Sequence, residues 1–139
     1  MTREDIYGAL FSLVSTAPGL VTFSRKLQHW NDVPSSQRPA LFQAQKSETA
    51  VNTTGIPTKW MLNVDLYIYV STLGANSPGE ILNPIIDFVT HVLDYPFPGQ
   101  PQTLGGLVQW ARVDGTIETD EGTLGADAIA IIPVQMLTT

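Results

Sequence analysis

The feature that most constrains the fold is an alternation of apolar and polar side chains over residues 59–71. One set of alternate positions is apolar: Trp60, Leu62, Val64, Leu66, Ile68 and Val70. Because successive side chains of a strand point to opposite faces of a sheet, this pattern predicts a long strand with one face in the core. The other face carries Tyr67 and Tyr69, which suit contact with a partner as well as simple coverage of the sheet.

Two segments have the spacing of amphipathic helices. The first holds Ile6, Ala9, Leu10, Leu13 and Val14 on one face. Thr2 and Asp5 before it predict a capping box. A second helix is expected to begin at Ser77-Pro78-Gly79-Glu80, with Ser77 as its cap, and to be bent at Pro84.

Shorter strands are predicted on either side of these elements, over residues 21–26, 40–45, 107–113, 116–119 and 126–137. Asp114-Gly115 predicts a two-residue hairpin turn, and Pro133 indicates an edge or a bulge because proline donates no ladder hydrogen bond. Residues 1–139 are therefore expected to form one α+β domain, a mostly antiparallel sheet of about five strands flanked by two main helices.

Two polar segments are predicted to lack regular structure. Residues 28–38 contain Trp30 and Pro34, and residues 46–58 contain Asn52-Thr53-Thr54-Gly55 without apolar periodicity. Such segments bury too little apolar surface to become ordered alone. We expect both to be mobile in the free monomer and to become ordered on assembly.

The charge balance limits the partners of the chain. It carries 13 acidic and 7 basic residues, for a net charge of −6. Sequence-specific nucleic-acid binding is therefore not expected, although an acidic surface is compatible with a passage through which DNA slides. The absence of cysteine excludes disulfides and thiol catalysis and is typical of a reducing cytosol. The sequence shows no signal-peptide layout, and no membrane-spanning segment is expected.

No constellation of catalytic or metal-binding residues is evident. His29 and His91 lack ligand-type partners at helical spacing, and the neighbouring carboxylates Asp120 and Glu121 lie at a predicted turn. Gly105-Gly106 precedes a strand, so it does not resemble a phosphate-binding loop. The sequence predicts a protein that is not an enzyme and that has no cofactor or metal site.

A tryptophan in a polar loop is the first candidate for an interface. Trp30, Asn31 and Asp32 are expected to meet a second subunit, with Arg25 and Arg38 supplying charge-assisted contacts. Tyr67 and Tyr69 complete this candidate set. The alternative is that Trp30 folds back on the core of its own subunit.

The chain resembles the tail terminator proteins of long-tailed bacteriophages. The likeness lies in residues 23–27, 30–33, 38–42, 115–118 and 131–134, which read FSRKL, WNDV, RPALF, GTIE and IIPV. It implies a ring, six-fold in that family, that caps the tail tube, stops its polymerisation and joins the tail to the head. The implied partners are further copies of the chain, the tail tube protein and the head-tail connector.

The resemblance also implies assembly in the bacterial host cytoplasm and a final location in the virion tail. Two alternatives remain from the residues themselves. One is a head-completion or tail-completion (neck) protein of the same virion, and the other is a small protein-binding module. A pocket with converging polar groups would instead favour an enzyme or a ligand-binding protein.

Overall fold

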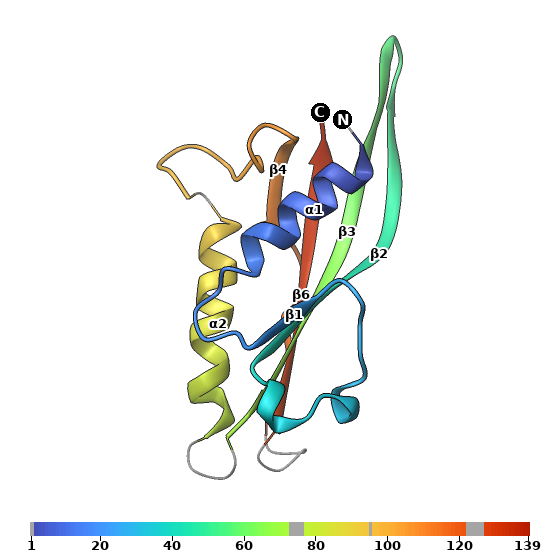
Figure 1. Ribbon diagram of the computed structural model, residues 1–139. Coiled ribbons are helices and arrows are strands. Elements are labelled where there is room, and N and C mark those ends of the chain that lie inside the picture. Colours follow the sequence, from blue (N-terminus) through green and yellow to red (C-terminus); the bar gives the residue numbers. More distant parts are fainter. Residues whose placement is uncertain (1, 73–76, 95, 122–126) are drawn as a thin grey trace.

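The computed structural model describes residues 2–72, 77–94, 96–121 and 127–139 and has an α+β fold (Figure 1). A six-stranded sheet has the order β1-β2-β3-β6-β4, and β5 also pairs with β6. The elements are α1 (Arg3–Val14), β1 (Thr22–Ser24), β2 (Ala40–Thr53), β3 (Ile56–Ser71), α2 (Pro78–Val92), β4 (Val108–Val113), β5 (Glu118–Glu121) and β6 (Asp127–Thr138). All pairs are antiparallel except β1 with β2.

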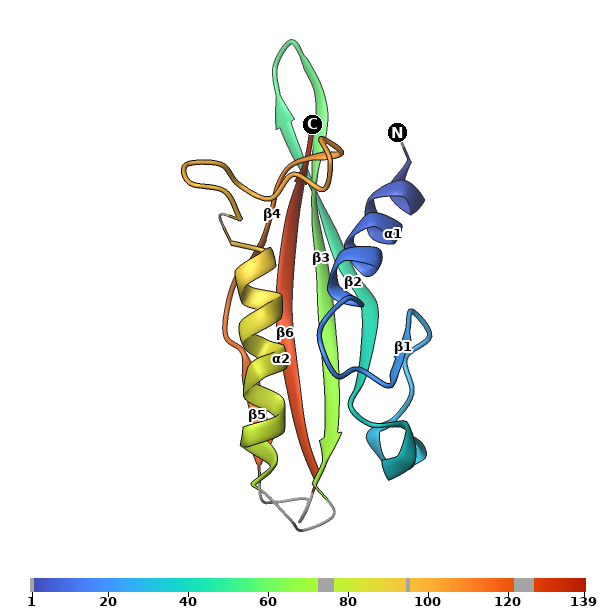
Figure 2. The same ribbon diagram turned by 60° about the vertical axis from the view of Figure 1, so that its left-hand side comes forward.

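Both helices cover the same face of the sheet, and the main core lies between them and the strands (Figures 1 and 2). The predicted apolar face of β3 is buried there, together with alternate residues of β6. Helix α1 contributes Ile6, Leu10 and Val14, and α2 contributes Leu82, Ile85 and Val89. This burial of the helix stripes and of one sheet face is the main favourable contribution to folding.

The starts of the two helices differ in how they are capped. Thr2 Oγ1 accepts a hydrogen bond from Asp5 N at 3.1 Å, and Asp5 Oδ2 accepts one from Thr2 N at 3.0 Å, which confirms the capping box. Helix α2 begins at Pro78 as predicted, but the Ser77 side chain makes no capping hydrogen bond. The preset φ of Pro78 favours this start without one.

The prediction for residues 46–58 was wrong, because they form the outer part of a long β2–β3 hairpin. Val51 pairs with Lys59 and Thr53 with Ile56, and Gly55 takes a φ of +82° in the turn. Backbone ladder bonds and β-branched residues therefore order a segment that buries little apolar surface. The periodicity of apolar residues could not reveal it, since neither face of this part belongs to the core.

The predicted Asp114-Gly115 hairpin is also wrong. Strands β4 and β5 do not pair with each other but follow one another along the same side of β6. Gly115 adopts a φ of +116°, and a Cβ there would lie 3.3 Å from Pro133 Cγ. Gly115 lies in the break between β4 and β5, which together form the edge beside β6. The Asp-Gly dipeptide is typical of a hairpin turn, but here it interrupts an edge strand.

Pro133 explains why this break occurs. Strand β6 is an inner strand, between β3 and the β4–β5 edge, and its pairing with β3 runs through Pro133 without a shift, so the prediction that Pro133 marks an edge or a bulge was wrong for its own strand. Pro133 O accepts from Asp114 N at 3.1 Å, so its backbone faces the β4–β5 side, where its nitrogen has no proton to donate. The missing donor therefore interrupts the pairing of the neighbouring edge, between the end of β4 and the start of β5.

Candidate functional site

The candidate site is the face of the sheet that lies opposite α1 and α2. In β6, Ala130 and Ile132 point to the helices, so Ile129 and Ile131 point to the uncovered face and are partly exposed. In the β5–β6 pairing, Glu118 lies beside Ile131 and Asp120 beside Ile129. Cross-strand partners share a face, so two carboxylates border an apolar strip on the uncovered side.

Two hollows flank Ile129 and Ile131. One has a volume of about 400 Å³, and its apolar lining includes Leu27, Trp30 and Tyr67. The other, of about 510 Å³, is lined by Ile117 and by the acidic strand β5. We call the two hollows together the apolar groove, with the lining residues Leu27, Trp30, Tyr67, Ile117, Ile129 and Ile131.

The loop that carries Trp30 is folded against the sheet in two 3₁₀ turns, Trp30–Asp32 and Ser35–Gln37. Trp30 is partly buried on a small apolar cluster of Val33, Ala40, Phe42 and Tyr69. The hydroxyl of Tyr69 donates to Gln28 O at 2.7 Å. Trp30 thus packs on its own subunit, as the alternative interpretation held, while its remaining surface lines the apolar groove.

Arg38 holds this loop from within. Its side chain is 3% exposed, and its Nε donates to Val33 O at 3.0 Å. The guanidinium also donates to Val70 O of β3 and to Trp30 O, and it lies 3.4 Å from Asp127 Oδ1. These contacts use the donors of the guanidinium within the subunit. The prediction that Arg38 supplies contacts to a partner was therefore wrong.

The predicted interface residues separate into three groups. Trp30, Tyr67, Tyr69 and the buried Arg38 lie together at one end of the uncovered face. Asn31 and Asp32 are exposed on the first 3₁₀ turn. Arg25 is apart from them, because its guanidinium forms a two-point ion pair with Glu4 of α1, with Nη2 and Oε1 3.1 Å apart.

The Tyr69 hydroxyl stays protonated in this setting. Burial raises the pKa of Tyr69, and the neighbouring Tyr67 raises it further, whereas Arg38 lowers it. The neutral phenol is therefore a hydrogen-bond donor at neutral pH and ties the sheet to the loop.

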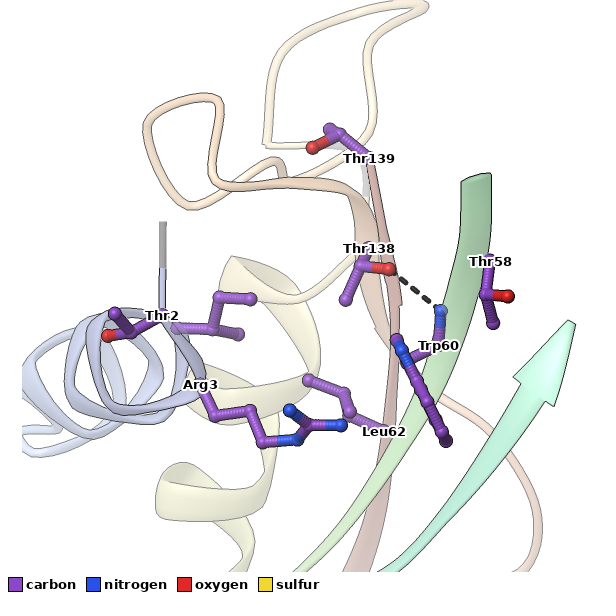
Figure 3. A pocket seen from close by; sticks show the side chains of 8 residues that line it. Thr2, Arg3, Thr58, Trp60, Leu62, Thr138 and Thr139 are labelled. Atoms are coloured by element: carbon purple, nitrogen blue, oxygen red, sulfur yellow. Dashed lines mark hydrogen bonds between the residues drawn. The ribbon is translucent and has the colours of Figure 1, made fainter. Parts of the chain in front are cut away.

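A further hollow of about 210 Å³ lies where the β2–β3 hairpin leaves the sheet (Figure 3). Figure 3 shows Thr2 and Arg3 of α1 on one side and Trp60 and Thr138 on the other. The Trp60 backbone N–H donates to Thr138 Oγ1 at 2.8 Å, and the Arg3 guanidinium lies 5.0 Å from the Trp60 ring centre. The hollow lies between the first turn of α1 and the base of the hairpin.

Glu48 of β2 is the charged group at this junction. Its two oxygens accept from Arg3 Nε at 2.7 Å and from the Tyr7 hydroxyl at 2.8 Å. Burial raises the pKa of Glu48, but the hydrogen bonds from Arg3 and Tyr7 outweigh burial and lower it. Burial and the Glu48 carboxylate together raise the pKa of Tyr7. The raised pKa keeps the Tyr7 phenol protonated, so it acts as a hydrogen-bond donor to Glu48 and helps to hold the hairpin base against α1.

Other chemistry has little support in the residues that the structure describes. Within them, no group of three or more His, Cys, Asp or Glu side chains is arranged to hold a metal ion. His29 and His91 are both exposed, one in the Trp30 loop and one on α2. Over the same residues, no helix has the length and apolar character needed to cross a membrane.

Sequence reasoning missed two parts of this site, the isoleucines of β6 and the projecting hairpin. Strand β6 has apolar residues on both faces, with Ile129 and Ile131 between Ala128, Ala130 and Ile132. That double-sided pattern is typical of a strand covered on both faces. Because helices cover only one face here, the pattern was a signal for a second apolar surface.

Comparison with known proteins supports the fold but gives no family. No protein-family model matches the chain, and no curated protein does. A solved structure is similar over 100% of this chain and 96% of its own, with a TM-score of 0.54 and 18% identical residues. At that identity the likeness shows that the two chains share a fold, and nothing of what this one does.

Proposed function

We propose that this chain is a tail terminator of a long-tailed bacteriophage. In this role it assembles into a ring, six-fold by analogy with that family, that caps the tail tube and ends its polymerisation. The ring then presents the surface that joins the tail to the connector of the head. It is a structural component of the virion tail, assembled in the host cytoplasm, and it performs no catalysis.

The uncovered apolar face of the sheet is the observation that carries this proposal. A monomeric soluble protein seldom exposes a groove lined by large apolar side chains, and such patches mark protein contacts. Here the apolar groove contains aromatic and β-branched residues bordered by carboxylates, as interface centres are bordered by polar rims. The five short segments that resemble tail terminators point to the kind of assembly.

The charge of the chain is consistent with the same role. Its net charge of −6 disfavours retention of DNA, which a ring on the path of the genome must let pass. A neck protein of the same virion would satisfy these features as well, so the experiment has to separate the two.

Deletion of the gene from its phage makes that separation. A terminator ends tube growth, so its loss should yield tails of variable, excessive length without heads, as seen by electron microscopy. Supplying the chain from a plasmid should restore one tail length. Loss of a neck protein would instead leave tails of normal length that fail to join heads. Normal, infectious particles would contradict both virion roles and favour a protein-binding module.

A further inference from the structure

The β2–β3 hairpin is ordered but has almost no partner within its own subunit. It projects beyond the rest of the sheet (Figures 1 and 2). Its outer residues pair only with each other, and Val51 and Ile56 are 38% and 54% exposed. A projecting ribbon with apolar side chains near its tip resembles an arm that packs on another molecule.

The hairpin and the apolar groove carry complementary groups. Both have exposed apolar side chains, and their charges are opposite. Lys59 lies at the base of the projecting part, whereas Glu118 and Asp120 border the groove. Among the residues that the structure describes, none of these three charged groups forms an ion pair. Unpaired charges of opposite sign on two apolar surfaces favour their association.

The two surfaces cannot meet within one subunit. Val51 pairs with Lys59, and Tyr69 pairs with Ile129 of the groove. Residues 59 and 69 belong to the same strand, so they lie roughly 33 Å apart at a rise of about 3.3 Å per residue. A stiff strand holds the hairpin and the groove at opposite ends of the sheet.

We infer that the apolar groove receives the β2–β3 hairpin of a neighbouring copy of this chain. Ile56 and Val51 enter the hollows beside Ile129 and Ile131, and Lys59 approaches the carboxylates of β5. The contact joins two different surfaces, so each subunit offers a hairpin to one neighbour and a groove to the other. Such head-to-tail contacts close into rings when the rotation allows it. The docking itself does not depend on the proposed function; only the closure of the contacts into a ring rests on it.

Engineered cysteines test the contact directly, because the natural chain has none. Full-length Ile56→Cys and Ile131→Cys proteins, purified separately, are mixed and oxidised gently. We expect a mixed disulfide dimer in large excess over that from Ile56→Cys mixed with Asn83→Cys, which places an exposed thiol on α2. No excess over this control would overturn the inference, whether or not the chain assembles.

Charge exchange gives a second and independent readout. Lys59→Glu should weaken self-association by about tenfold or more in sedimentation experiments at low salt, and added Glu118→Lys should restore it. Unchanged association in Lys59→Glu would count against the docking, provided its thermal unfolding matches the parent. Rings of fixed number without the disulfide would refute the docking and leave the terminator proposal standing. Formation of the disulfide without closed rings would support the docking and contradict the terminator proposal.

Discussion

The two faces of the sheet differ in what covers their apolar residues, not in whether they have any. Ile132 of β6 points to the helices and is 0% exposed, whereas its neighbour Ile131 points the other way and lines the apolar groove. The same strand therefore supplies one isoleucine to the core and one to an open surface. Apolar character alone does not distinguish a residue that stabilises the fold from one available to a partner.

The edges of the two faces differ in a related way. On the helix side, Glu48 and Arg3 pair with each other, and the charges are neutralised within the subunit. On the uncovered side, Glu118 and Asp120 form no ion pair among the described residues. At these two places, the charges of the covered edge are paired within one chain, whereas two carboxylates of the uncovered edge have no ion-pair partner among the described residues. We expect substitutions on the first face to affect folding and those on the second to affect assembly.

The largest effect should come from the adjacent isoleucines of β6. Ile132→Ala leaves a cavity between the sheet and the helices and should lower the free energy of unfolding by about 2–5 kcal/mol. Ile131→Ala should lower it by less than about 1 kcal/mol but should weaken self-association. Urea unfolding at a protein concentration where the chain is monomeric measures the first effect, and sedimentation the second. Equal losses of folding stability would show that the uncovered face belongs to the core.

The sequence predicted the elements whose periodicity reports burial. The alternation in residues 59–71 and the helical stripes of α1 and α2 identified the α+β class, the main core and both helices. These patterns arise because burial on one side of an element selects apolar residues at its own repeat. For the same reason, the projecting hairpin escaped prediction, since the core selects none of its side chains.

Pairing partners and long-range contacts were beyond the sequence. Asp114-Gly115 has the composition of a hairpin turn, but the neighbouring Pro133 converts it into a break beside β6. Trp30 was correctly placed in a loop with Tyr67 and Tyr69 as fellow candidates, and they do meet around one hollow. The burial of Arg38 was not foreseen, because its acceptors are backbone carbonyls, two in its own loop and one in β3, which no side-chain pattern encodes.

Arg38→Met should give the next largest effect and sharpen the boundary between the faces. The change leaves three backbone carbonyls and Asp127 without their donor, at a cost of about 2–3 kcal/mol. Because Arg38 ties the Trp30 loop to β3, amide exchange should speed up over residues 28–38 before the rest of the sheet. Arg25→Met, which loses the ion pair with Glu4 and a surface hydrogen bond to Gln45, is the control and should leave that loop protected. Loop protection unchanged by Arg38→Met would mean that apolar packing of Trp30 holds the loop.

The smallest effect concerns Glu48, where the covered face ends and the hairpin begins. Its hydrogen bonds hold the pKa of Glu48 below the ordinary value of 4.5, so the carboxylate stabilises the fold at neutral pH. A lowered folded-state pKa means that this stabilisation is present above the unfolded value and is lost as pH falls through the folded one. Glu48→Gln should therefore cost about 1 kcal/mol at pH 7, a figure reduced for partial exposure.

The gap in unfolding free energy between the parent and Glu48→Gln should begin to close as the pH falls below about 4.5 and vanish at lower pH. Tyr7→Phe removes the hydroxyl that donates a hydrogen bond to the Glu48 carboxylate. It is the matched variant, because the aromatic ring stays in the core. Its loss should overlap with that of Glu48→Gln, so the double variant should cost less than the two single costs together. A gap that persists unchanged at pH 3 would place the contribution of Glu48 in packing, and the hairpin base would then be held to α1 without its charge.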